Sequence, residues 1–396
     1  MSLLLKPDIT VNDIKIGMDA NSSEDVARDL AEIGRNIPIV SVGDYVLNIG
    51  DLKSLRLQVA LNCLPSFTMT ITDTNYQVRE VLKRQIDKCV IFIGYKEWYI
   101  KFNGIITTIQ SDPGDEDIEL TGILFNDKLY QTEQKSYRDL SPSDVFLDIC
   151  KKTKMGLFTF DNLLLNKKID YCLNTEVRFI DYIDNIIQTY TDNIYAYDLF
   201  YHLHVGNIES IRKQKFDQYT VKPTGEKISP QDIIFTSHSR PREEDQIKDQ
   251  YKLPIEFYTL NSNFTKTFLS NASEYKVGIP GIDSGKIIPS DVNIGYGNIG
   301  TNTFSGFKEH KNPFYSNIIN KSLGGNVISI SLKQLMFEIS PFSVVGFEAY
   351  LPETGDKKYR LDEEHSGKKV VIGFRIEYEK SMTNGKNYIH QTIDLI

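Results

Sequence analysis

Two kinds of hydrophobic spacing divide the chain. From Ile37 apolar and polar residues alternate, as in residues 55–61 and 67–71, and the same alternation returns after Gly325. A period of two is typical of strands with one buried face. Residues 141–191 carry helical spacing instead. The chain is therefore predicted to be mainly β with an α+β insert: two β-barrel, tube-like domains flank a helical α/β middle domain and a long irregular segment.

The first barrel is predicted over residues 37–125, with one short helix over residues 75–88 whose apolar residues share a face. Short strands this close together are typical of a closed or nearly closed barrel. The strands are expected at residues 55–61, 67–71, 90–93, 98–102, 105–109 and 118–124.

The middle domain is predicted over residues 126–207, where a polar connector leads into two helices. The first helix has Ser141 as its N-cap, Pro142 in its first turn and Asp144 near its positive end. Gly156 follows its expected C-terminus. Its buried stripe is Val145, Phe146, Ile149 and Cys150.

A second helix and an aromatic hairpin complete the middle domain. Apolar residues recur at helical spacing from about Asn174 to Thr191. Residues 194–207 then form two strands rich in tyrosine, phenylalanine and histidine, with a tight turn between them.

The remaining parts are less regular. Residues 1–36 are predicted to be an N-terminal arm with one helix between Ser23 and Gly34, and residues 208–325 are an insertion rich in Gly, Asn, Ser and charge. An insertion of this length is either disordered or held by neighbouring subunits. The second barrel is predicted over residues 326–396, with a hairpin turn at Asn384-Gly385. Its strands are expected at residues 327–332, 336–339, 344–351, 370–379 and 388–396.

The order of elements in residues 118–207 resembles the central hub proteins of contractile phage tails, a superfamily that includes the T-even phage hub, late control protein D and the N-terminal part of secretion spikes. In that family a barrel strand reading like Glu119-Leu120-Thr121-Gly122 leads into the two helices, and an aromatic hairpin ending near Asn207 carries the chain onward. The likeness extends over residues 37–207 and, more weakly, 326–396.

The resemblance implies a structural function without catalysis. Two related barrels per chain would let a homotrimer form a pseudo-six-fold ring that adapts the hexameric tail tube to a trimeric central spike. The chain stops right after the last barrel strand, at Ile396, so the spike is expected to be a separate polypeptide. The other implied partners are a tail tube or tube-initiator protein and further baseplate proteins, in a virion that assembles in the host cytoplasm and serves host cell entry.

Composition limits the functional classes to which the chain can belong. The net charge is −8, which argues against a nucleic-acid-binding surface. The N-terminus lacks the features of a secretory signal, and no apolar run reaches the roughly 20 residues of a membrane span. Four scattered cysteines without a CxxC pair indicate a reducing compartment. The 22 tyrosines and 21 phenylalanines suit interfaces, and they also support a rival function as a tail-tip glycan-binding or cell-wall-degrading protein.

Candidate chemical motifs are weak, and no catalytic, cofactor or metal residues are predicted. Residues 295–300 match G-x-G-x-x-G but lack the following helix that a dinucleotide needs. His202 and His204 share one face of a strand, yet without further ligands they are interpreted as half-exposed hairpin positions. The acidic run 112–119 lacks EF-hand spacing and is interpreted as a solvated turn. No G-x-S-x-G elbow is present.

Overall fold

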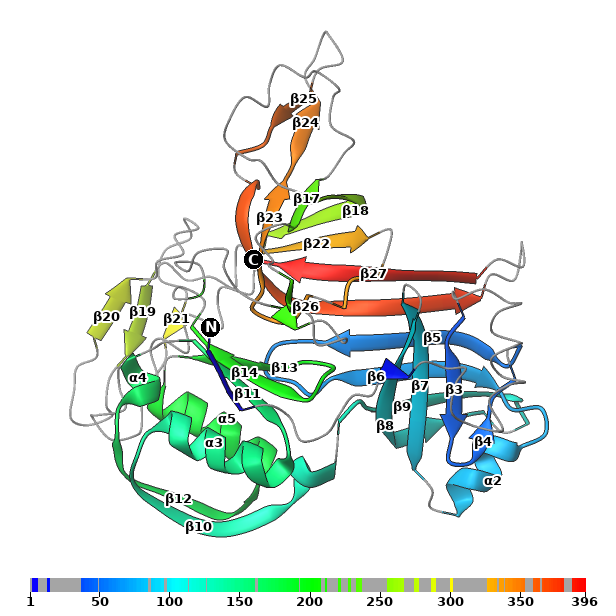
Figure 1. Cartoon of the computed structure of the whole chain (residues 1–396), viewed down its shortest axis with the longest axis horizontal. Coiled ribbons are helices and arrows are strands. Elements are labelled where there is room, and N and C mark those ends of the chain that lie inside the picture. The colour runs from blue at the N-terminus through cyan, green and yellow to red at the C-terminus, as the bar shows by residue number, and fades with distance from the viewer. Residues whose placement is uncertain are drawn as a thin grey trace.

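The computed structural model describes most of residues 37–207 and 326–396 and short parts of the rest (Figure 1). The described residues are 2–5, 13–14, 37–48, 50–84, 87–95, 98–112, 114–125, 127–160, 163–191, 193–207, 211, 220–221, 227–228, 233–236, 255–266, 274–277, 286–289, 300–301, 326–332, 335–337, 339–352, 359–363, 365–380 and 387–396. The predicted helix between Ser23 and Gly34 and the predicted turn at Asn384-Gly385 lie outside these residues.

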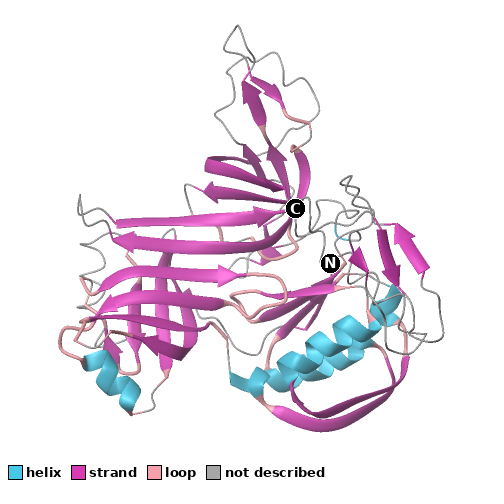
Figure 2. Ribbon diagram, turned by 180° about the vertical axis from the view of Figure 1, so that it is seen from behind, coloured by secondary structure: helices cyan, strands magenta, loops and turns pink. Residues whose placement is uncertain are grey.

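The predicted fold class is confirmed, because a single large sheet dominates the molecule and the helices are few (Figure 2). This 14-stranded sheet runs in the order β23-β17-β18-β22-β27-β26-β5-β6-β9-β8-β7-β3-β4, and β2 pairs with β8. The first curled unit is built from β3 (Ile39–Val42), β4 (Tyr45–Val46), β5 (Leu52–Val59), β6 (Ser66–Thr72), β7 (Lys88–Tyr95), β8 (Trp98–Gln110) and β9 (Asp117–Ile123), with α2 (Gln77–Lys83) at one end.

The second barrel closes on itself. Its strands are β17 (Ile233–Thr236), β18 (Ile255–Lys266), β22 (Asn326–Leu332), β23 (Val344–Glu348), β26 (Gly367–Lys380) and β27 (Asn387–Leu395). Closure comes from β26, which is long enough to pair with β23 at one end and with β27 along the rest. A short hairpin of β24 (Tyr350–Pro352) and β25 (Tyr359–Leu361) projects from this barrel (Figure 1).

One antiparallel strand pair joins the two barrels. Strand β26 pairs with β5 from Phe374↔Val59 to Glu379↔Ser54. Residues on both sides of this seam belong to one hydrophobic core, which includes Leu57 of the first barrel and Ile376 of the second. The predicted alternation in β26 holds from Phe374 to Tyr378, where Phe374, Ile376 and Tyr378 are buried. Ile372, predicted to lie on the same face, is only half-buried, because the pairing register shifts between Val371 and Gly373. The two barrels therefore share a core.

The middle domain has a core of its own around two helices, α3 (Pro142–Thr153) and α5 (Phe179–Tyr190). A curved ribbon of β10 (Thr132–Leu140) and β12 (Ile169–Arg178) wraps their outer side (Figure 1). A second sheet, in the order β1-β11-β14-β13, lies between the helices and the barrels. Its strands are β1 (Ser2–Leu5), β11 (Gly156–Thr159), β14 (His202–Gly206) and β13 (Ile194–Tyr197). Short elements complete this domain: η1 (Asp127–Tyr130) and α4 (Leu163–Asn166).

Helix α3 begins as predicted. The Ser141 hydroxyl accepts a hydrogen bond from the Asp144 amide, and the Asp144 carboxylate accepts one from the Ser141 amide, which together form a capping box. The predicted stripe of Val145, Phe146, Ile149 and Cys150 is fully buried. The last helical residue is Thr153, and the C-cap residue Lys154 adopts the left-handed region with φ 61°. Gly156 follows this C-terminus, as predicted, and is the first residue of β11.

The start of the second helix and the polar connector were predicted wrongly. Residues 174–178 continue strand β12, and α5 begins only at Phe179. The connector before α3 is strand β10. Both strands form because each supplies the other's backbone partners, from Thr132↔Arg178 to Leu140↔Ile169. In β10 only Tyr137 is buried and the other residues are exposed or half-buried, so the strand shows no apolar alternation and its sequence resembles a loop.

Other differences concern strand limits. The strands expected at 98–102 and 105–109 are one strand, β8, and residues 336–337 and 339 of the strand expected at 336–339 lie outside any strand. The helix expected over 75–88 covers only Gln77–Lys83. Residues 2–5 of the predicted arm pair with β11, and β2 (Asp13–Ile14) pairs with β8. These described parts of the arm therefore pair with strands of their own chain.

The segment 208–325 is not irregular throughout. Its described parts hold strands, and β17 and β18 belong to the second barrel. Most of these strands are too short to display a period of two, and the barrel strands β17 and β18 pair with β23 and β22, which lie far away in the sequence. The other strands are β15 (Thr220–Val221), β16 (Lys227–Ile228), β19 (Glu274–Val277), β20 (Lys286–Pro289) and β21 (Gly300–Thr301).

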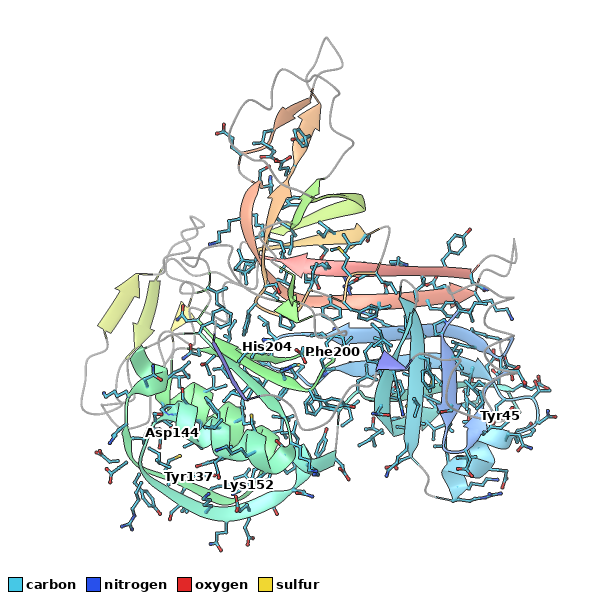
Figure 3. The ribbon with its side chains drawn as sticks, viewed as in Figure 1. Tyr45, Tyr137, Asp144, Lys152, Phe200 and His204 are labelled. Carbon is cyan, nitrogen blue, oxygen red and sulfur yellow. The ribbon has the colours of Figure 1, made fainter. Side chains whose placement is uncertain are left out.

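An ionic network ties the ribbon to α3. The Asp148 carboxylate accepts hydrogen bonds from Lys135 Nζ at 2.7 Å and Tyr137 Oη at 2.8 Å, and it lies 3.1 Å from Lys152 Nζ. Tyr137 and Lys152 are labelled in Figure 3. Burial by itself would raise the pKa of Asp148, but the hydrogen bonds from Lys135, Tyr137 and Lys152 outweigh burial and lower this pKa.

We therefore expect Asp148→Asn to destabilise the middle domain by about 1.5 kcal/mol near neutral pH. A carboxyl whose folded-state pKa is lowered stabilises the protein above its unfolded pKa, about 4, and this stabilisation is lost as the pH falls through the lower folded-state pKa. The difference in unfolding free energy between wild type and variant should thus shrink below about pH 4. Urea titrations from neutral to acid pH measure it, with the exposed Asp139→Asn as control. A difference that is independent of pH would contradict this role.

Candidate functional site

The hairpin of β13 and β14 lies where the three hydrophobic cores meet. Its turn residue Leu199 belongs to the barrel core, whereas Tyr201 belongs to the core of the middle domain. Ala196 joins a third core together with Phe342 of the second barrel. Figure 3 shows Phe200 and His204 at this central position. The hairpin therefore connects all three parts of the fold.

Contacts with the connection between β5 and β6 hold the hairpin against the first barrel. Leu61 forms an isolated bridge with Ala196, and the Asn62 amide donates to the Tyr195 carbonyl at 2.9 Å. The Phe200 ring packs near Phe102 of the first barrel, with centroids 6.4 Å apart.

Asp198 organises the turn of this hairpin. Its Oδ1 accepts hydrogen bonds from the backbone amides of Phe200 at 2.8 Å and His202 at 2.9 Å. These two bonds form a side-chain turn of the kind that aspartate favours, and they allow Tyr201 to adopt a positive φ of 61°. They also fix the plane of the carboxylate.

The other carboxylate oxygen faces two imidazoles. Asp198 Oδ2 lies 3.0 Å from His202 Nδ1 and 2.9 Å from His204 Nε2. All three side chains are buried, and His204 is only 1% exposed. The two histidines lie on one face of β14 because side chains two residues apart in a strand point the same way. We call Asp198, His202 and His204 the hairpin cluster.

Aromatic rings enclose the hairpin cluster. The Phe158 ring of β11 lies 4.9 Å from the His202 ring and 5.0 Å from the His204 ring, measured between centroids, and it stacks on His204. Phe342 of the second barrel approaches His204 edge-on at 6.5 Å. His204 Nδ1 is buried and has no hydrogen-bond partner among the described residues.

Burial and mutual contacts set the ionisation of the cluster. Burial by itself would raise the pKa of the Asp198 carboxyl, but the charge of His202 and the hydrogen bonds from both imidazoles outweigh burial and hold this pKa well below its ordinary value. Burial lowers the pKa of His204, and the interactions with Asp198 oppose this effect without reversing it. The cluster thus combines an ionised carboxylate with an imidazole that favours its neutral form.

The sequence-based interpretation of the histidines was wrong on one point. His202 and His204 are buried rather than half-exposed, because the hairpin lies between cores instead of on a surface. The third member, Asp198, was missed. An aspartate at the end of one strand, four residues before a histidine at the start of the next, is the available signal, since Asp commonly bonds amides within such turns.

The other sequence candidates do not converge in the described part of the chain. Asp117 of the acidic run pairs with Lys53 and accepts a hydrogen bond from Thr72 at 2.9 Å. Among the described residues, the hairpin cluster is the one group of three His, Cys, Asp or Glu whose possible ligand atoms all lie within 4.8 Å of one another. Of the G-x-G-x-x-G match, only Gly300 is described, as the first residue of β21.

Two further features bear on the sequence predictions. Cys89, Cys150 and Cys172 are buried free thiols, whereas Cys63 is exposed. Burial raises the pKa of Cys89 to about 12, which makes it unreactive. Among the described residues, no helix is both long and apolar enough to cross a bilayer.

Comparison with known proteins gives relatives in structure but none in sequence. No protein-family model matches the chain, and no curated protein matches its sequence. The 43 kDa tail protein of prophage MuSo2 from Shewanella oneidensis superposes with a TM-score of 0.56 at 8% identity, covering 91% of this chain and 96% of that one. A tail protein from Neisseria meningitidis MC58 superposes with a TM-score of 0.52 at 11% identity, covering 91% and 95%.

Because these superpositions cover 91% of the chain, they extend over at least part of each barrel and of the middle domain. The resemblance to phage tail hub proteins that residues 118–207 suggest is thus confirmed at the level of the fold: the chain has the fold of phage tail proteins.

Proposed function

We propose that this chain is a structural protein of a phage tail baseplate, and that three copies form a ring between the tail tube and the central spike. The observation that carries the proposal is the β26–β5 pair, which fixes two curled β units side by side in one sheet with a common core. The fold shared with phage tail proteins supports the tail location.

The shared core suggests how such a ring matches two symmetries. A unit that cannot rotate against its neighbour presents both of its barrels at a fixed spacing. Three copies then present six barrels toward a six-fold tube, while everything outside the barrels repeats only three times. Rings of identical subunits are the common form of closed assembly.

The middle domain and the projecting β24–β25 hairpin break the likeness between the two barrels. In the proposed ring these three-fold elements serve the contacts with a separate trimeric spike and with other baseplate proteins. The chain acts through these contacts during host cell entry and performs no catalysis. Particles assemble in the host cytoplasm.

Electron cryo-microscopy of the tail particle tests this arrangement. We expect three copies of the chain at the junction of tube and spike, with two barrels of each copy facing the tube. Two or four copies, or copies located away from this junction, would contradict the proposal. Saturable binding of a host oligosaccharide to the isolated chain would instead favour a glycan-binding tail-tip protein.

A further inference from the structure

We propose that the hairpin cluster is a structural binding site for a divalent transition-metal ion, with Asp198 Oδ2, His202 Nδ1 and His204 Nε2 as its protein ligands. This site is independent of the proposed tail function. The ion would stabilise the conformation of the hairpin at the point where the three hydrophobic cores meet.

The distances within the cluster fit a metal after small movements. Ligand atoms about 2.0–2.1 Å from a tetrahedral zinc ion lie roughly 3.3 Å apart. The two nitrogen–oxygen distances are 3.0 and 2.9 Å, and all possible ligand atoms lie within 4.8 Å of one another. Admitting an ion thus requires the carboxylate to recede by a few tenths of an ångström and the two rings to turn toward each other.

The carboxylate is already oriented for such a role. Asp198 Oδ1 accepts hydrogen bonds from the amides of Phe200 and His202 and lies 3.3 Å from His202 Nδ1, whereas Oδ2 lies closer, at 3.0 Å from His202 Nδ1 and 2.9 Å from His204 Nε2. Outer hydrogen bonds of this kind orient metal-ligating groups in known sites. Because Oδ1 already accepts two amide hydrogen bonds, Oδ2 is the oxygen better placed to bind an ion.

The charge of the hairpin cluster also favours the binding of a cation. Asp198 is 4% exposed, and the ion pairs it forms within the described chain are with the two histidines alone. A carboxylate in a protein interior is costly unless a positive charge compensates it. A divalent cation supplies one.

The ligand set selects the class of metal. Two imidazoles and one carboxylate suit Zn²⁺, Co²⁺, Ni²⁺ or Fe²⁺, whereas Ca²⁺ and Mg²⁺ prefer six or more oxygens. Three protein ligands leave a fourth position for water. The Phe158 and Phe342 rings beside the imidazoles limit the space around that position.

The test uses the full-length chain, freed of metal with a chelator and titrated with Co²⁺, whose visible absorption becomes intense in a four-coordinate site. We expect one Co²⁺ per chain with the intense spectrum, its displacement by Zn²⁺, and a higher melting temperature with Zn²⁺. His202→Gln and His204→Gln should each weaken binding by at least about tenfold, as lost metal-site contacts do.

His390→Gln and His365→Gln are matched controls, because these histidines pair with Glu377 and Asp362 outside the cluster. They should bind Co²⁺ like the wild type. An unchanged Co²⁺ spectrum, or binding that is lost in the control variants and kept in His204→Gln, overturns the proposal.

A measurement on wild-type protein covers the case in which the cluster variants do not fold. X-ray absorption of the Zn²⁺-loaded chain should show a nitrogen and oxygen shell with the scattering pattern of two imidazoles. A shell that contains sulfur, or oxygen alone, places the ion elsewhere and overturns the assignment.

Discussion

Replacing Ile376 by aspartate is expected to unfold both barrels together. Ile376 is 1% exposed, pairs with Leu57 across the seam and belongs to the core that the two barrels share. An uncompensated buried charge costs roughly 3–5 kcal/mol, and loss of the buried side chain adds to this cost. Together these losses approach the roughly 5–15 kcal/mol that stabilises a typical domain.

Thermal unfolding followed by circular dichroism measures this effect, and Phe374→Asp should behave in the same way. Glu379→Asp is the control, because it places an aspartate at an exposed position of the same strand. If Ile376→Asp leaves the first barrel folded with its native hydrogen-exchange protection, the two barrels do not share a cooperative core.

Gly122→Val is expected to destabilise the first barrel strongly. A Cβ at this position would lie 2.2 Å from the Ile105 carbonyl oxygen and 2.4 Å from the Phe67 ring. The carbonyl belongs to the neighbouring strand β8, so relief requires β8 and β9 to separate. Overpacking of a core usually costs about 1–3 kcal/mol. The cost of a clash with strand backbone should lie at or above the upper end of this range.

Gly50→Ala is the matched control for this substitution. A Cβ there would meet nothing nearer than Lys380 Nζ at 3.9 Å. We expect the control to change the urea midpoint little, and Gly122→Val to yield insoluble protein or a much lower midpoint. Equal midpoints would show that β8 and β9 are not packed as described.

Local chemistry in the sequence was enough to predict the parts that stabilise themselves. The capping box at Ser141 and Asp144 fixes the start of α3 within a few residues. The alternation in β5, β6 and β26 is strong because each of these strands has one face in the shared core. The aromatic hairpin was predicted because both of its strands are short, apolar and adjacent in the sequence.

Elements that depend on distant partners were missed. Strand β12 extends to Arg178 because β10 supplies its hydrogen bonds, although residues 174–178 continue the helical pattern that follows. Strands β17 and β18 complete the second barrel through pairings with β23 and β22, which lie many residues further along the chain. Pairings between strands so far apart in the sequence produce no recognisable pattern in either strand.

The hairpin cluster was missed for a related reason. Its two histidines were recognised as sharing a face, but their burial depends on Phe158 and Phe342, which come from other parts of the fold. Asp198 acts through backbone amides within its own turn, and the significance of that turn depends on the cores that surround it.

The central claim is that three copies of this chain form one ring, and the mass of the assembled hub tests it most directly. Native mass spectrometry of the chain purified with its spike and tube neighbours should give a hub component of about 136 kDa, three times the 45.4 kDa of one chain. A hub component with the mass of two or four chains, or one chain alone bound to the spike, would contradict the claim.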